Sequence, residues 1–187
     1  MASHATPTRL PPERIASIAE RAAEAFSYTN DFQIERVVEE LGGRIRFKDF
    51  WNSTKSGSLE VSGLKDFDIF IPSHTTNERD RFTIAHELGH YILHYLTNSD
   101  PRSERKFTID RYGDNAIETE ANLFAFSFLM PSNKFREQLE ECNGEISAVA
   151  RFFGVSDTAA RLRANMLKVH AQRKSKSIGS AAGFSAA

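Results

Sequence analysis

Apolar residues recur along the chain with two different periods, and the changes of period mark the expected elements. Helical spacing of apolar residues predicts a first amphipathic helix after residue 12 and a second one over residues 34–41. The period then falls to two, which predicts short strands over residues 44–48, 59–61 and 67–71. Because one side of each strand is polar, we expect a small antiparallel sheet with one solvated face.

The second half of the chain reads as helical throughout, apart from a polar stretch over residues 97–115 that predicts a loop. Pro131 follows an almost wholly apolar run and predicts the end of a buried helix. The expected helices cover about residues 75–96, 117–130, 133–141, 146–153 and 156–167. We therefore expect an α+β fold.

The composition divides the chain into four parts. Residues 1–11 read as a flexible leader, and residues 12–141 hold the strands and most of the helices. Residues 142–169 contain two short helices that form a C-terminal helical pair. Residues 170–187 are rich in Lys, Ser, Gly and Ala and predict a disordered tail.

Charge and cysteine usage exclude several classes of protein. The net charge of −1 gives no overall attraction to nucleic acid or to anionic lipid. The single thiol, Cys142, cannot form an internal disulfide, and the N-terminus lacks the apolar core of a signal peptide. The longest apolar stretch, residues 121–130, is about half a membrane span. We expect a cytoplasmic protein with no membrane contact.

A His-Glu-x-x-His motif carries the candidate chemistry. His86 and His90 are one helical turn apart, so their Cβ atoms lie about 5–6 Å from each other and both imidazoles can reach one Zn²⁺ ion. Glu87 points to the side of this pair and can reach a water molecule at the metal. The motif predicts a metal-assisted hydrolase in which Glu87 is the general base.

Catalytic zinc usually has a third protein ligand, and two carboxylates of a later helix are candidates. Glu118 shares a helical face with small residues that would let this helix approach the histidine helix, whereas Glu120 points nearly opposite and reads as a solvated carboxylate. Geometry therefore favours Glu118 as the ligand. Asn122 lies one turn beyond Glu118 and is expected to orient a histidine ligand from behind.

The role of His94, one turn beyond His90, stays open at this stage. It can bind a transition-state oxyanion or fill a fourth metal position, but a surface histidine is the simpler interpretation. Tyr91, Tyr95 and Tyr112 are further candidate oxyanion donors, among which the sequence does not choose.

Two segments together resemble the ImmA/IrrE metallopeptidase family. They are FTIAHELGHYILH at residues 82–94 and ETEANLFAFSFLMP at residues 118–131. The DFDIFIP segment before the motif and the FGVS segment after it extend the resemblance over roughly residues 14–167. It implies a zincin-like metallopeptidase core in which His86, His90 and Glu118 bind zinc and Glu87 is the base.

The resemblance also implies a substrate class, since the family is similar to site-specific endopeptidases that cut helix-turn-helix repressors of phages, mobile elements or stress responses. Some relatives are instead toxin-like partners of a repressor-type antitoxin. Many relatives carry an XRE-type helix-turn-helix ahead of the peptidase, for which the expected leader is too short. Phe128 replaces a leucine of the family pattern, which we read as a packing change.

A rival function comes from the C-terminal helical pair. Gly154 and Ser156 are placed as the cap residues of a helix-turn-helix, and Arg161 and Arg163 lie on its second helix. The commoner alternative is an αα-hairpin packed on the core, and so few basic residues predict only weak, salt-sensitive DNA binding. A zinc-stabilised, non-proteolytic partner of a repressor or antitoxin is a third possibility.

Overall fold

The computed structural model describes residues 6–26, 33–48, 57–97, 107–108 and 115–169. The expected tail over residues 170–187 and the candidate Tyr112 lie outside these residues. Within the described part of the chain, every helix is too short or too polar to cross a lipid bilayer.

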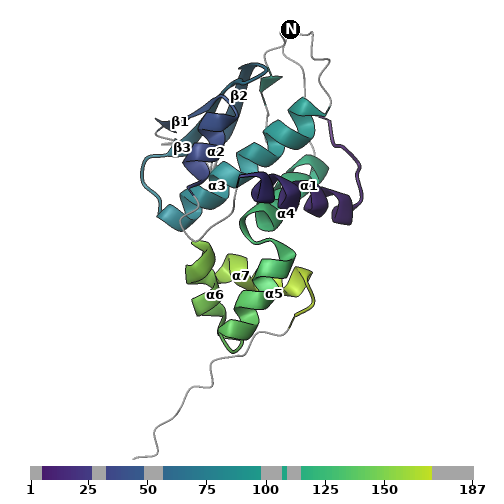
Figure 1. The fold of residues 1–187 in the computed structure, drawn as a ribbon. Coiled ribbons are helices and arrows are strands. Elements are labelled where there is room, and N and C mark those ends of the chain that lie inside the picture. Colours follow the sequence, from purple (N-terminus) through teal and green to yellow (C-terminus); the bar gives the residue numbers. More distant parts are fainter. Residues whose placement is uncertain (1–5, 27–32, 49–56, 98–106, 109–114, 170–187) are drawn as a thin grey trace, which may run out of the picture.

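Seven α-helices, one π-helix and four strands make up an α+β fold in the described residues (Figure 1). The N-terminal part contains α1 (Pro12–Ala25), α2 (Ile34–Glu40), β1 (Gly43–Lys48), β2 (Ser58–Gly63), β3 (Asp66–Pro72), α3 (Asn77–Gly89) and η1 (His90–Leu96). The C-terminal part contains β4 (Phe107–Thr108), α4 (Asn115–Leu129), α5 (Ser132–Glu141), α6 (Ile146–Phe153) and α7 (Asp157–Met166).

The sheet has the strand order β1-β3-β2-β4 and is mixed, so the prediction of a purely antiparallel sheet was wrong. β2 pairs with β3 and with β4 in antiparallel fashion, but β1 runs parallel to β3, with Ile45 opposite Ile69. Alternation of polar and apolar residues reports which face of a strand is buried and carries no information about its direction. The short strand β4 has no comparable alternation and was not predicted.

One face of the sheet is buried and the other is charged. Phe67, Ile69 and Ile71 of β3 point into the core, where α2 and α3 cover the sheet. On the opposite face Arg44 donates hydrogen bonds to Asp66 and Asp68 across the strands. In β2 and β3 the side-chain alternation that predicted the strands thus also predicted the buried face, whereas Phe47 near the end of β1 is 69% exposed.

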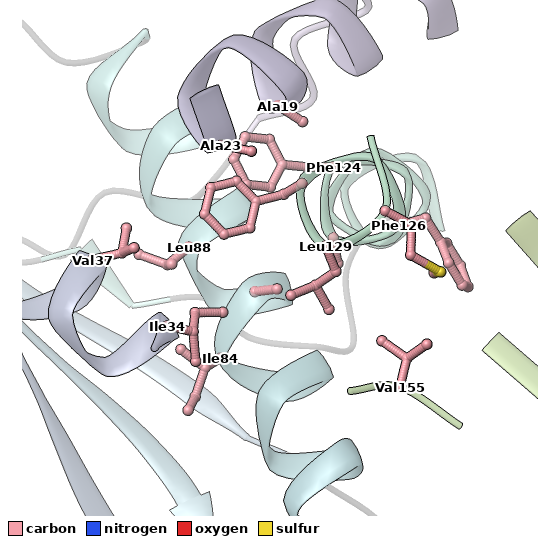
Figure 2. Close-up of a cluster of buried hydrophobic side chains, with 14 of the residues drawn as sticks. Ala19, Ala23, Ile34, Val37, Ile84, Leu88, Phe124, Phe126, Leu129 and Val155 are labelled. Carbon is pink, nitrogen blue, oxygen red and sulfur yellow. The ribbon is translucent and has the colours of Figure 1, made fainter. Parts of the chain in front are cut away.

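The helix α4 lies at the centre of the molecule and packs against α1, α3, η1 and α7. Figure 2 shows Ala19 and Ala23 of α1 beside Phe124 of α4. These two alanines are fully buried and lie one turn apart, so they allow a close approach of the two helices. This central position explains why α4 is apolar on nearly all sides.

The C-terminal helical pair has the predicted caps. Gly154 ends α6 in the left-handed conformation with φ of 62°, and the Ser156 side chain accepts a hydrogen bond from the backbone N–H of Ala159 at the start of α7. Arg163 of α7 is 2% exposed and donates to the backbone carbonyl of Met130 and to the Ser127 hydroxyl. The pair is therefore bonded to α4, and a domain boundary near residue 142 stays a prediction.

Candidate metal centre

The histidine pair sits where α3 passes directly into the π-helix η1. Sequence analysis predicted one regular helix to Leu96, whereas the last seven residues, from His90 onward, form the wider π-helical turns. Such turns are rare and frequently occur at functional sites. Periodicity over so few residues does not distinguish a π-helix from an α-helix, so the sequence contains no signal for it.

Gly89 explains how α4 comes close to the histidines. A Cβ atom placed on Gly89 would lie 3.1 Å from Phe124 Cβ and 3.2 Å from the carbonyl oxygen of Ala121. The glycine thus permits a close approach of the two helices at this level, which is a common reason for a glycine in the middle of a helix. This approach brings the polar residues at the N-terminal end of α4 to the histidines.

Three candidate ligand residues converge at this point. His86 Nε2 and His90 Nε2 are 3.0 Å apart, and the two carboxylate oxygens of Glu118 lie 3.3 Å and 3.4 Å from them. In a tetrahedral site with bonds of about 2.0–2.2 Å, ligand atoms are about 3.3 Å apart. The donor set and its spacing therefore fit a zinc ion. No other group of this kind was found among the described residues.

The protonation states suit a cation at this position. Burial lowers the pKa of His90, which favours the neutral imidazole that binds metal. Burial raises the pKa of Glu118, but the neighbouring His86 and His90 side chains outweigh it and hold the pKa well below its usual range. The site thus contains a carboxylate and two histidines, of which His90 favours the neutral form. The Glu118 side chain is 28% exposed.

The predicted base Glu87 is buried in the same region, at 1% exposure. Gly57, the residue before β2, lies beside it, because a Cβ atom on Gly57 would come within 2.9 Å of Glu87 Oε1. Sequence analysis did not identify Gly57, since a glycine before a strand reads as ordinary turn chemistry. The edge of β2 therefore begins at the candidate base.

Asn122 lies behind the metal site, where the sequence placed it. Its Oδ1 atom is 3.0 Å from His86 Nδ1. An amide oxygen at this position accepts the Nδ1 proton and leaves Nε2 of His86 free for a metal.

Two sequence interpretations need correction. His94 is 1% exposed and so is not a surface histidine: its two ring nitrogens lie 3.1 Å from His90 Nδ1 and 2.9 Å from Glu120 Oε2. Glu120 is 8% exposed and so is not a solvated carboxylate. The polar side of α4 is covered by the segment before α1, where Thr8 and Arg9, assigned to a flexible leader, donate backbone hydrogen bonds to Glu120.

The tyrosines near the motif point to other partners. The Tyr91 hydroxyl accepts a hydrogen bond from the backbone N–H of Lys65, and its ring stacks on Phe67. Tyr95 stacks on Tyr91 in turn. Both rings are buried, and the contacts of Tyr91 connect η1 to the β2–β3 hairpin, which is a packing role.

Comparisons with known proteins identify a family and a similar fold. The family model Peptidase_M78, described as an IrrE N-terminal-like domain, matches residues 38–165. A Mycobacterium tuberculosis transcriptional regulator has a similar structure, with a TM-score of 0.60 and 18% identity over 87% of this chain. The chain spans 48% of that regulator, so the likeness concerns the fold of about half of it. No curated protein sequence matches the chain.

Proposed function

The chain belongs to the Peptidase_M78 family, and from this premise we propose that it is a zinc-dependent endopeptidase with a zincin-like core. The observation that carries the proposal is the convergence of His86, His90 and Glu118 beside Glu87. Two histidines, a carboxylate ligand and a neighbouring glutamate are the set that metal-assisted peptide hydrolysis needs. The family match and the site chemistry therefore support the same reaction class.

In this mechanism His86, His90 and Glu118 hold the ion, and a bound Zn²⁺ supplies the Lewis acidity that makes water nucleophilic near neutral pH. Glu87 accepts the proton of the attacking water as its oxygen adds to the peptide carbonyl carbon. Glu87 then delivers this proton to the amine that leaves when the C–N bond breaks. Burial of Glu87 keeps bulk water from competing for the proton.

We place the extended substrate along β2. The strand β3, which directly precedes α3, is an inner strand between β1 and β2 and so is not the edge for substrate addition. β2 lies beside β3, and among the residues that the structure describes β4 pairs with its outer edge only at Glu60 and Val61. This edge begins at Gly57 beside Glu87 and can add a peptide strand.

The proposed substrate is a helix-turn-helix repressor, and the cell compartment is the cytoplasm. The resemblance of the two motifs to the ImmA/IrrE metallopeptidases supports this substrate class. DNA binding by α7 is disfavoured by one observation, since the Arg163 side chain is buried and bonded to α1 and α4 and is not available to a phosphate. The C-terminal pair acts here as a packed αα-hairpin.

Glu87→Gln tests the proposal because it keeps the side-chain shape and removes the proton acceptor. We expect zinc content and thermal stability near those of the wild type. Cleavage of a helix-turn-helix repressor encoded beside this gene should fall about 10²–10⁴-fold, as measured by mass spectrometry of the fragments. Equal cleavage by both forms would remove Glu87 as the base. A stable complex without cleavage by the wild type would favour the non-proteolytic partner instead.

A further inference from the structure

A row of buried hydrogen-bonding groups connects the metal site to the N-terminal segment. His94 stands between two of them: its Nδ1 lies 3.1 Å from His90 Nδ1, and its Nε2 lies 2.9 Å from Glu120 Oε2. His90, His94 and Glu120 are each at most 8% exposed. The hydrolytic steps above use neither His94 nor Glu120, so this row needs its own explanation.

The far end of the row contains only donors. Glu120 Oε2 accepts the backbone N–H and the hydroxyl of Thr8, each at 2.9 Å, and Oε1 accepts the backbone N–H of Arg9 at 2.9 Å. The Thr8 oxygen meanwhile accepts the N–H of Leu10, which leaves its proton for Glu120. Glu120 is therefore a fixed acceptor, and its ionised form is the one that satisfies every neighbour.

This acceptor sets the direction of each hydrogen bond in the row. A carboxylate facing His94 Nε2 requires a proton on that nitrogen, so in the neutral imidazole His94 Nδ1 carries a lone pair. The lone pair requires a proton on the facing His90 Nδ1. His90 Nε2 is then left without a proton, and its lone pair points to His86 Nε2 and Glu118.

We propose that Glu120 and His94 are positioning residues that hold His90 in the tautomer able to bind metal through Nε2. The inference rests on the proposed function only in that a divalent ion binds at His86, His90 and Glu118. Asn122 holds His86 in the same tautomer in a single step. The N-terminal segment thereby contributes to the metal site through the hydrogen bonds of Thr8 and Arg9 to Glu120.

The tautomer of His94 is the first test, and it needs no variant. In the zinc-loaded wild-type protein near pH 7.5, ¹⁵N NMR of the imidazole nitrogens should show a proton on His94 Nε2 and none on Nδ1. A proton on Nδ1, alone or together with one on Nε2, would overturn the proposal. Failure of the wild type to bind any divalent ion would instead overturn the proposed function, and this inference with it.

Variants separate positioning from simple structural support. His94→Leu should weaken zinc binding about 10–100-fold in a competition titration, which is the usual cost of losing the hydrogen-bond partner of a ligand histidine. His94→Asn places an amide oxygen near the position of Nδ1 and should recover at least fivefold of that loss. Zinc affinity of His94→Leu within twofold of the wild type would contradict the proposal.

Glu20→Gln is the matched control for Glu120→Gln. Both carboxylates accept hydrogen bonds from distant elements, but Glu20 binds Arg163 and Ser132 and lies outside the row. We expect Glu120→Gln to lower zinc affinity at least tenfold, because the glutamine amide cannot accept hydrogen bonds from all the donors that surround Glu120. Glu20→Gln should lower only the resistance to unfolding by urea. Equal zinc affinities of the two variants would assign Glu120 a structural role alone. If His94→Leu does not fold, the comparison of Glu120→Gln with Glu20→Gln and the NMR measurement still test the proposal.

Discussion

Arg163 Nη2 donates a hydrogen bond to Glu20 Oε1 at 3.0 Å and so joins α7 to α1 across 143 residues of sequence. The Arg163 side chain is 3% exposed and the Glu20 side chain 24% exposed, so the pair is shielded mainly on the arginine side. The same guanidinium donates to the carbonyl of Met130 where α4 ends. One side chain thus connects the first, central and last helices.

Arg163→Met should destabilise the protein by about 2–4 kcal/mol in urea unfolding, somewhat less than the loss of a partner from a fully buried pair. The buried carbonyl of Met130 and the Ser127 hydroxyl also lose their donor. Arg161→Met on the exposed side of α7 is the control and should change stability by less than about 0.5 kcal/mol. A similar loss of unfolding free energy in both variants would show that the Arg163–Glu20 pair makes no specific contribution to stability.

Gly57→Ala should impair catalysis and spare metal binding. The new Cβ atom would come within 2.5 Å of Thr83 Cγ2 and 2.9 Å of Glu87 Oε1, so the candidate base must move. Because small displacements of a positioned base are costly, we expect kcat/KM to fall at least about tenfold. Gly63→Ala, at the other end of β2, meets no atom within 4 Å and should retain activity. A lower zinc affinity of Gly57→Ala than of Gly63→Ala would contradict the view that the change at Gly57 displaces Glu87 alone.

The metal stoichiometry should be one zinc per chain, as measured by elemental analysis of the purified protein. Glu118→Gln should weaken zinc binding more than Glu120→Gln does, because the first change alters a ligand and the second acts through His94 and His90. A His86→Ala, His90→Ala double variant should retain no stoichiometric zinc. Retention of zinc by that variant would show that the ion binds elsewhere.

Gly89→Ala tests the close approach of α3 and α4. Alanine gains about 1 kcal/mol of helix propensity over glycine, whereas overpacking costs about 1–3 kcal/mol. The nearest atoms are Phe124 Cβ and the carbonyl oxygen of Ala121, which belong to or adjoin the backbone and yield little. We therefore expect a net loss of about 1 kcal/mol and weaker zinc binding, since Glu118 is carried away from the histidines. A stabilised variant with unchanged affinity would refute the packing argument.

Much of this arrangement could be predicted from local sequence patterns. Helices and strands with clear periodicity, such as α6 with its Gly154 cap, lie close to their predicted bounds. The spacing of His86 and His90 predicted the pair that converges, and the helical wheel selected Glu118, which lies beside it. These features depend on residues within one or two turns of each other, or on one helix meeting another.

The remaining features depend on contacts between distant segments. Glu120 reads as solvated on a helical wheel, because a wheel does not show that Thr8 and Arg9 cover that side of α4. Three histidines spaced four residues apart were a usable signal for His94, but its partner could not be identified without the fold. The parallel pairing of β1 with β3 likewise depends on tertiary packing that a strand's own alternation does not encode.

The position of α1 bears on where a folding unit begins. The family match starts at residue 38, after α1 and most of α2. A chain shortened to residues 38–165 would lose Ala19 and Ala23 from the surface of α4, the Glu20 partner of Arg163 and both backbone donors to Glu120. We expect such a fragment to aggregate or remain unfolded, because an apolar central helix would face water. We therefore expect the unit that folds to begin before residue 38, where the family match starts.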